Sequence, residues 1–465
     1  MANYSNAHNG AHQPSEVGGF SFSAWLGVAA LSRILPPLML AFLMLINWCH
    51  ADSLRLHGSN TVGEKYAPLL IEGFLKHQGY VLISTKPGAV AVEKQIVATD
   101  SNTQQQFIVD LKSHGSSTGF ADLLAKKTDI AMSSRPVKAA ELEALQALYP
   151  NLERAAMEHI IAFDALAVIV HPDNPINHLT LAQLAQIFAG EIDNWQALGG
   201  ADQPLSILAR DDNSGTYDTF KSLVLKPNER KLTPQAKRFE SSSQLTQQVL
   251  TTPGAIGFVG ISHTAESKIL AIATAPGASG IKPDQYTIGT EDYPLSRRLY
   301  LYAPTLTQGS AAKAFIEFAV SETGQRLAKN AELISFFPTS SRPRLDQRNL
   351  QREYRNLALY GRRLSVTLRL DNNQLDGKTR RDLARIVSYH QQNPHNRIVL
   401  AGFWDDPKLS SSSQQQLATW LEVLKQALNE AALEPWLVSG GFLPIENNQV
   451  EQGRALNRRV EVWVL

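Results

Sequence analysis

The segment ARDDNSGTYDTF (residues 209–220) follows the short apolar run LSIL (205–208) and precedes a stretch with helical periodicity. This order predicts a strand that ends near Arg210, a loop, and a helix that begins near Ser214. Hydroxyls at a helix start usually cap unpaired backbone N–H groups, and capping alone explains most such clusters. An arginine placed before two hydroxyls that flank a glycine also suits a bound anion. The rest of the chain must decide between these interpretations.

Three further hydroxyl-rich segments lie between a strand-like run and a helical pattern: GSNT (58–61), HGSSTG (114–119) and DIAMSSRP (129–136). Helix N-termini present unpaired N–H groups and a partial positive charge, which bind tetrahedral oxyanions. Hydroxyls add donors, and glycine lets the backbone approach an anion closely. Together the four segments predict an oxyanion site with Arg135 and Arg210 as candidate cations. The glycine-lysine pattern of a nucleotide phosphate loop is missing, so a nucleotide is not indicated.

The length and net charge of the chain limit which classes of protein it can belong to. A chain of 465 residues is long enough for two or three domains with large cores. Its 44 basic and 43 acidic side chains leave a net charge of +1 at pH 7. Such a balance gives no electrostatic attraction for nucleic acid, so we expect no nucleic-acid partner.

The N-terminal region resembles an export signal in its physical pattern. Arg33 precedes the apolar run ILPPLMLAFLMLINW (34–48), and the small residues Cys49 and Ala51 fit cleavage after Ala51. An uncleaved anchor through residues 20–48 is the alternative, because residues 20–32 are also apolar. Residues 1–51 are therefore predicted to be a signal peptide or an N-terminal anchor. We expect the protein in the periplasm or cell envelope of a Gram-negative bacterium.

The remainder of the chain divides by pattern into two domains and a linker. Residues 52–338 alternate strand-like and helical runs, which predicts an α/β fold with a mostly parallel sheet, divided into two lobes. Residues 339–362 are predicted to form an arginine-rich linker, partly helical in one interpretation. Residues 363–465 alternate strands and helices and predict a compact α+β domain.

The four hydroxyl-rich segments resemble the phosphate-binding loops of the PstS-like phosphate-binding proteins of ABC transporters, and the resemblance covers about residues 52–338. It implies a two-lobed periplasmic-binding-protein clamshell with inorganic phosphate in the interlobe cleft, and an ABC permease as a partner. Crossovers between the lobes are expected near residues 162–164 and after Gly260. The implied phosphate ligands are Ser59, Asn60, Thr61, Ser116, Ser117, Ser134, Arg135, Arg210, Ser214, Gly215 and Thr216.

One position departs from the family pattern. Some members carry an aspartate in the third loop, where it accepts the proton of monohydrogen phosphate and so rejects sulfate. Here Ser134 stands at that place. A serine can still accept a hydrogen bond, and Asp211 or Asp212 could assist, so the choice between phosphate and sulfate stays open.

The C-terminal sequence GRALNRRVEVWV (453–464) resembles the terminal motif of OmpA-like domains, which attach envelope proteins to peptidoglycan. The resemblance implies peptidoglycan, or the outer membrane, as a further partner. Asp405 fits the family aspartate that grips diaminopimelate together with a helix arginine. The following helix, which begins SSSSQQQLATWLEVL, carries no such arginine. We therefore expect a retained but altered association with the wall.

The predicted function is binding of inorganic phosphate for uptake or sensing, combined with attachment to the cell envelope. The alternative is a structural or adhesive envelope protein whose anion-binding fold serves another purpose. An enzyme is not indicated, because the chain has no HExxH motif and its histidines are scattered. We predict no catalytic residues, no metal and no cofactor.

Overall fold

The computed structural model describes residues 52–278, 280–342, 350–369, 375, 377–445, 448–449 and 451–465. The predicted signal peptide or anchor (1–51) and residues 343–349 of the predicted linker lie outside the described residues. Within the described ranges, none of the helices has both the length and the apolar character that crossing a membrane requires.

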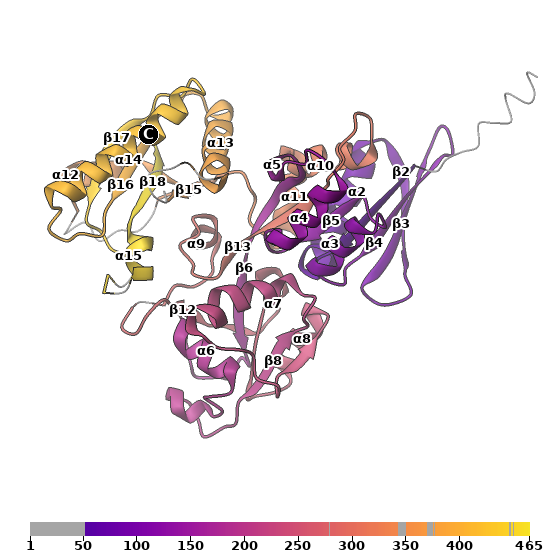
Figure 1. Ribbon diagram of the computed structural model, residues 1–465, viewed down its shortest axis with the longest axis horizontal. Helices are drawn as coiled ribbons and strands as arrows, with labels where there is room; N and C mark the ends of the chain where they lie inside the picture. The colour runs from indigo at the N-terminus through magenta and orange to yellow at the C-terminus, as the bar shows by residue number, and fades with distance from the viewer. Residues whose placement is uncertain are drawn as a thin grey trace, which may run out of the picture. The chain divides into compact units, whose positions relative to one another are not determined.

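Lobe 1, formed by residues 52–164 and 296–338, is a sheet covered by helices on both faces (Figure 1). β1 pairs in parallel with β4 and β5, while β2 and β3 add an antiparallel hairpin at the edge. One face packs against α2, α10 and α11, and the other against α3 and α4. The strands are β1 (Asp52–Gly58), β2 (Tyr80–Pro87), β3 (Glu93–Asp100), β4 (Gln106–Lys112) and β5 (Ile130–Ser133). The helices are η1 (Val62–Tyr66), α2 (Ala67–His77), α3 (Ser116–Leu124), α4 (Ala139–Leu148), α5 (Arg154–Met157), α10 (Ala311–Val320) and α11 (Glu322–Asn330).

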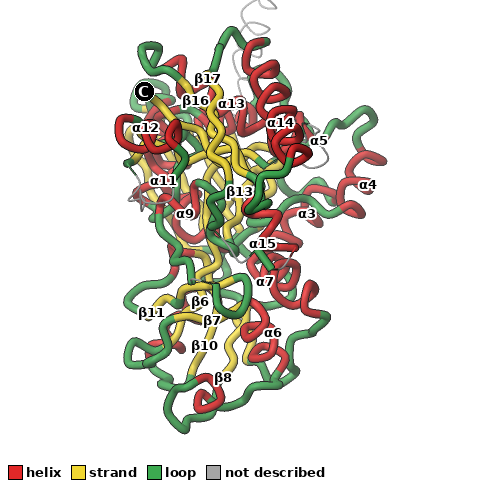
Figure 2. Tube along the Cα trace, turned by 90° about the vertical axis from the view of Figure 1, so that its left-hand side faces the viewer, coloured by secondary structure: helices red, strands yellow, loops and turns green. Residues whose placement is uncertain are grey.

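Lobe 2, residues 165–295, is built around three parallel strands in the order β10-β8-β9. Figure 2 shows β8 and β10 side by side with α6 next to them. Phe220 stacks on Phe258 with ring centroids 4.0 Å apart, at the centre of this core. The strands are β7 (His178–Thr180), β8 (Ser206–Arg210), β9 (Lys237–Phe239), β10 (Ala255–Gly260), β11 (Lys268–Ile269) and β12 (Ala271–Ala273). The helices are α6 (Leu181–Ala189), η2 (Trp195–Leu198), α7 (Gly215–Phe220), η3 (Lys221–Leu225), η4 (Lys226–Asn228), α8 (Ser242–Leu250), η5 (Ile261–His263) and α9 (Gln285–Gly289).

Two long strands join the lobes. β6 (Glu158–Val170) pairs with β13 (Ser296–Tyr302) along its first half and with β10 along its second half. Its near-continuous apolar sequence is typical of a strand that is buried on both faces. The partner changes after residue 165, which confirms the first predicted crossover near residues 162–164.

Two details of the predicted α/β architecture are wrong. The chain does not cross back after Gly260, because β11 pairs with the far end of β6 and β12 pairs with β7, and the return comes only along β13. The sheet is mixed rather than mostly parallel. Parallel pairing holds within the centre of each lobe, whereas the β2–β3 hairpin and the crossing strands pair antiparallel.

The C-terminal domain has a five-stranded sheet in the order β14-β15-β18-β16-β17. The final strand β18 lies between β15 and β16 with all its residues buried, and Val460, Val462 and Val464 pack in one core cluster while Trp463 packs in another. Within the predicted linker, α12 packs on this sheet through Tyr354 and Leu357. The elements are β14 (Ser340–Ser341), α12 (Arg352–Tyr360), β15 (Arg362–Leu368), α13 (Gly377–Gln392), β16 (Ile398–Phe403), α14 (Ser411–Asn429), β17 (Trp436–Gly441), α15 (Glu451–Asn457) and β18 (Arg459–Val464).

The C-terminal domain docks on the crossing strands through buried charges. The Arg298 guanidinium of β13 lies 2.8 Å from the Asp382 carboxylate of α13. The Arg385 guanidinium lies over the ring of Phe163 in β6, 4.4 Å from its centroid. Buried ion pairs demand well-matched geometry to offset the loss of hydration, so these contacts fix α13 against the strands that join the lobes.

Candidate functional site

Loops from both lobes bring four buried hydroxyls together. The Oγ1 atoms of Thr61 in lobe 1 and Thr216 in lobe 2 lie 3.0 Å apart and share a hydrogen bond. In lobe 1, the Oγ atoms of Ser116 and Ser134 lie 3.4 Å apart, and Ser116 Oγ also accepts from the Ser134 N–H. All four side chains are at most 1% exposed. We call Thr61, Ser116, Ser134 and Thr216 the hydroxyl cluster.

Two glycines allow the lobes to meet at this cluster. A Cβ atom added to Gly215 would lie 2.1 Å from Ser116 Oγ and 2.6 Å from Ser134 Oγ, across the interlobe contact. Gly115, at φ 142°, would place a Cβ only 2.3 Å from the Asn213 carbonyl oxygen. Any larger residue at either position would hold the loops apart, so the glycines permit close contact between loops, whereas the sequence predicted a close approach of backbone to an anion.

The capping interpretation holds for one of the predicted residues only. Ser214 caps α7, because its Oγ accepts from the N–H groups of Thr216 and Tyr217 at 3.2 and 3.4 Å. Thr61 precedes η1 without a side-chain capping bond, so its hydroxyl is directed across the cleft instead. The loop with Ser134 does not lead straight into a helix, since α4 begins at Ala139.

Arg210 lies behind the cluster in lobe 2 and is 1% exposed. Its guanidinium donates to Ser242 Oγ at 2.6 Å, to the Phe239 carbonyl at 3.2 Å, and to the Glu240 carbonyl. None of these three acceptors carries a negative charge. Burial lowers the pKa of Arg210 to about 10, so it remains charged at neutral pH. The region therefore carries a formal positive charge that its hydrogen-bond partners do not neutralise.

Asn60 connects Arg210 to the first loop. The Ser242 N–H donates to Asn60 Oδ1 at 3.1 Å, and the Oγ of the same serine accepts from Arg210. The Nδ2 atom of Asn60 is buried and has no hydrogen-bond partner among the described residues. Ser59 is also buried, and its N–H donates to the Met132 carbonyl at 2.9 Å.

A second arginine, which the sequence interpretation missed, contacts the cluster directly. Arg297 of β13 donates to Thr216 Oγ1 at 2.8 Å and to Thr61 Oγ1 at 3.3 Å. Asp164 of β6 holds this guanidinium through bonds of 2.8 and 2.6 Å, and its other oxygen accepts from the Ile261 N–H at 3.0 Å. The sequence signal was the presence of charged residues in two apolar strands, Asp164 in DALAVIV and the Arg297–Arg298 pair in SRRLYLY.

Arg135, predicted as a ligand, has its donors engaged elsewhere. It pairs with Glu141 at 2.6 Å and, across the lobes, with Asp218 at 2.8 Å. Its remaining contact with the predicted set is a 3.2 Å hydrogen bond to Ser117 Oγ. Arg135 therefore joins the two lobes through an ion pair, and its charge is already neutralised by carboxylates of the protein.

The two aspartates that could assist Ser134 are also engaged elsewhere. Asp212 pairs with Arg238 at 2.8 Å, and Asp211 accepts from the Asn213 N–H at 2.9 Å. Burial raises the pKa of Asp211, in opposition to the charge of Arg210. In the described part of the chain, neither carboxylate is hydrogen-bonded to Ser134.

In the C-terminal domain, Asp405 has an arginine partner, although the sequence analysis found none in the following helix. Its Oδ2 atom lies 2.7 Å from Arg458 Nη1, so the cation comes from the terminal motif rather than from α14. The Asp405 carbonyl accepts from Asn448 Nδ2 at 2.7 Å. Ser413, on the first turn of α14, donates to the neighbouring Asp406 at 2.9 Å.

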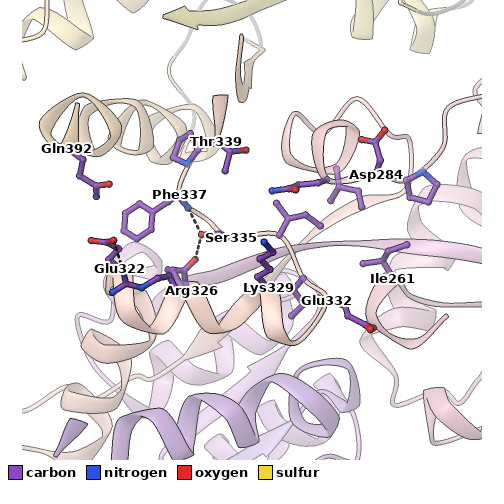
Figure 3. Close-up of a pocket in the computed structure, with 17 residues that line it drawn as sticks. Ile261, Asp284, Glu322, Arg326, Lys329, Glu332, Ser335, Phe337, Thr339 and Gln392 are labelled. Carbon is purple, nitrogen blue, oxygen red and sulfur yellow. Dashed lines mark hydrogen bonds and ion pairs between the residues drawn. The ribbon is translucent and has the colours of Figure 1, made fainter. Parts of the chain in front are cut away.

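Cavities lie on two sides of the lobes. One, of about 560 Å³, has Glu322, Arg326 and Lys329 of α11 along one wall (Figure 3). Asp284 lies on the opposite wall, so the charges of this cavity are mixed. None of the predicted phosphate ligands lines it. Another cavity, of about 900 Å³, is lined by both Arg135 and Arg297 and so adjoins the hydroxyl cluster.

Comparison with known proteins finds relatives for the part of the chain that forms the two lobes. The model of the PBP superfamily domain matches residues 77–323. The phosphate-binding protein PstS of Pseudomonas aeruginosa is 31% identical over 235 residues, which cover 47% of this chain and 71% of the relative. PstS of Bacillus subtilis is 28% identical over 302 residues, covering 63% of this chain and 90% of the relative. The solved structure of a putative phosphate ABC transporter substrate-binding protein with bound phosphate from Clostridium perfringens is 26% identical with a TM-score of 0.47, covering 61% of this chain and 99% of the other.

Proposed function

The chain belongs to the PBP superfamily and, within it, to the family of the phosphate-binding protein PstS, and we propose that it binds inorganic phosphate between its two lobes. The observation that carries this proposal is the hydroxyl cluster with Arg297. Donors separated by up to 236 residues in the chain meet at one buried point, which local helix capping alone does not require.

The chemistry of the cluster suits a small oxyanion. Each hydroxyl can rotate its proton toward a ligand oxygen, so an anion between the lobes would replace the present hydroxyl–hydroxyl hydrogen bonds with charge-assisted ones. Arg297 is held in one orientation by Asp164, and Arg210 contributes a positive charge nearby. Donors fixed before the ligand arrives reduce the entropy that binding must overcome.

Ser134 sets the expected selectivity. A carboxylate at this place would accept the proton of monohydrogen phosphate and repel fully ionised sulfate, whereas a hydroxyl can donate to either anion. We therefore expect sulfate to compete with phosphate. In a Ser134→Asp variant, the preference for phosphate should increase.

Lobe closure around the anion would provide the signal for an ABC permease, as hinge closure does in other two-lobed binding proteins. Arg135 and Asp218 would latch the closed form, because their ion pair joins the two lobes. On this proposal the protein is an exported binding protein of the periplasm or cell envelope, with a role in phosphate uptake or sensing.

We further propose that the C-terminal domain associates with peptidoglycan. The Asp405–Arg458 pair offers both charges that a zwitterionic amino acid requires, although binding must first open the pair. A peptidoglycan pull-down of the full chain tests this association. No retention above that of an unrelated soluble protein would reject it.

Calorimetric titration with phosphate, sulfate and molybdate tests the central proposal. Thr216→Val removes one donor with little change in volume and should weaken phosphate binding by about 10- to 100-fold. Thr251→Val, at an exposed site of the same lobe, is the matched control and should bind like the wild type. If the wild-type chain binds none of the three oxyanions, phosphate binding is rejected in favour of a structural or adhesive role.

A further inference from the structure

The cavity of about 900 Å³ lies where both lobes and the C-terminal domain meet, and its lining is strongly basic. Nine of its 18 lining residues are lysine or arginine, and two are acidic. Lobe 1 contributes Lys138 and Arg154, lobe 2 contributes Lys221 and Lys226, and α13 contributes Arg381. Three separate walls therefore present cations to one space.

Ion pairs do not cancel this charge. Lys221 and Lys226 are exposed and have no carboxylate partner among the described residues. The other seven cations share six carboxylates, so three of the nine positive charges stay unmatched. These carboxylates are Glu141, Glu158, Asp164, Asp218, Glu291 and Asp382.

Three residues that line the cavity also carry buried donors without partners among the described residues. The Arg298 side chain is 4% exposed, and Glu291 and Asp382 hold its Nε and Nη2 atoms. Its Nη1 atom is buried and has no hydrogen-bond partner in the described part of the chain. Ser296 and Arg381 also line the cavity, and their Oγ and Nε atoms are likewise buried without a hydrogen-bond partner among the described residues. Because buried donors are nearly always satisfied in folded proteins, three such atoms around one cavity indicate an acceptor-rich ligand.

We propose that this cavity binds a chain of linked phosphates, such as tripolyphosphate, with the C-terminal domain as one of its walls. A single tetrahedral anion cannot reach cations on three walls of a 900 Å³ space, whereas a chain with several charged groups can. Lysines at the rim suit this ligand, because they act as mobile point charges for phosphate oxygens.

The lining favours a free phosphate chain over a nucleotide. Tyr300 is the only aromatic residue that lines the cavity, so a base would have little surface on which to stack. The proposal goes beyond orthophosphate binding and does not depend on it. Arg297 nevertheless lines this cavity and bonds to Thr61 and Thr216, so the two sites adjoin.

Calorimetry of the full chain with sodium tripolyphosphate tests the proposal. Lys221→Ala/Lys226→Ala removes two cavity cations that take no part in the hydroxyl cluster. We expect tripolyphosphate affinity to fall by about tenfold or more, and orthophosphate affinity to change by less than about twofold. Lys231→Ala/Lys282→Ala removes two exposed lysines that do not line the cavity, and should leave both affinities unchanged.

Arg381→Ala tests the wall that the C-terminal domain provides. This variant should also bind tripolyphosphate more weakly than the wild type. Thermal unfolding of the variant checks that it is folded. Absence of tripolyphosphate binding, or equal weakening in both double variants, would overturn the proposal. ATP binding as tight as that of tripolyphosphate, and equally sensitive to the cavity lysines, would assign the cavity to nucleotides instead. Loss of orthophosphate binding alone would reject the function proposed above and leave this inference standing.

Discussion

The hydroxyl cluster between the lobes and the Asp405 loop of the C-terminal domain satisfy their polar groups in opposite ways. In the cleft, neutral hydroxyls from loops 155 residues apart bond to one another, and each can turn toward a ligand. In the loop, a carboxylate is already closed by a 2.7 Å ion pair with Arg458. A ligand at the cleft exchanges weak hydrogen bonds for strong ones, whereas a ligand at the loop must first separate two charges. The cleft is therefore ready to bind, and the loop is occupied by its own residues.

The largest difference should appear when one cation is removed from each region. Arg297→Ala leaves the fully buried Asp164 carboxylate without its partner and should lower the free energy of unfolding by about 3–5 kcal/mol. Arg458→Ala, where the arginine is 28% exposed, should cost about 1 kcal/mol or less. Urea unfolding of both variants measures this. Equal losses would contradict the distinction between a buried and a partly solvated pair.

The second-largest effect is expected when a methyl group is added to the cleft at Gly215, and it concerns phosphate affinity. Gly215→Ala places its Cβ against Ser116 and Ser134, so the lobes cannot meet, and phosphate affinity should fall by about 10- to 100-fold. The control is Gly200→Ala in the same lobe. Its added Cβ atom would lie 3.1 Å from the Trp195 carbonyl oxygen, and it should have little effect on phosphate affinity. Peptidoglycan retention should be the same in both variants. Unchanged phosphate binding in Gly215→Ala would remove this contact from the site.

Acid should act first through His263 of η5, which lies beside Thr61 of the hydroxyl cluster, and only at lower pH on the Asp405 loop. Burial, aided by the charges of Lys65 and Arg210, lowers the pKa of His263 to about 3. The unfolded chain, with a histidine pKa of about 6.5, then binds more protons than the folded chain between these values, so stability falls as pH drops below about 6.5. From pH 6 to pH 5, wild-type unfolding free energy should fall by about 1 kcal/mol more than that of His263→Gln.

The Asp406 carboxylate beside the loop gives the contrasting pH range. Backbone and hydroxyl donors of Ser410, with the N–H of Lys408, hold its pKa below the usual value. A lowered aspartate pKa stabilises the fold above the unfolded value of about 3.8, and this contribution is lost only below it. An Asp406→Asn variant should thus show the wild-type pH dependence between pH 6 and 5. A change in that range would contradict the assignment to His263.

The smallest effect is expected at Asp405 itself. Because its charge is already satisfied by Arg458, Asp405→Asn should lower peptidoglycan retention by about twofold to threefold. The measurement is a quantitative pull-down with thermal unfolding as the check on folding. Retention below a tenth of the wild-type level would mean that the carboxylate is free to contact the wall. Unchanged retention would place the contact elsewhere.

The sequence indicated which loops form the candidate site, but it did not indicate which charged side chains pair with one another. Hydroxyls and glycines at helix starts singled out Thr61, Ser116 and Thr216, which the structure brings together because loops at the ends of central strands converge. Arg297 and Asp164 escaped notice, since a charged residue within an apolar strand gives no local sign of its partner. The partners of Arg135 and Asp405 depend on side chains 83 and 53 residues away, and no spacing rule reports such pairs.

The most direct test is a crystal structure with arsenate, whose anomalous scattering locates a tetrahedral anion. The account predicts an arsenic peak between the lobes, with arsenate oxygens within hydrogen-bond distance of Thr61, Ser116 and Thr216. A peak at another place, with these hydroxyls still bonded to one another, would contradict it.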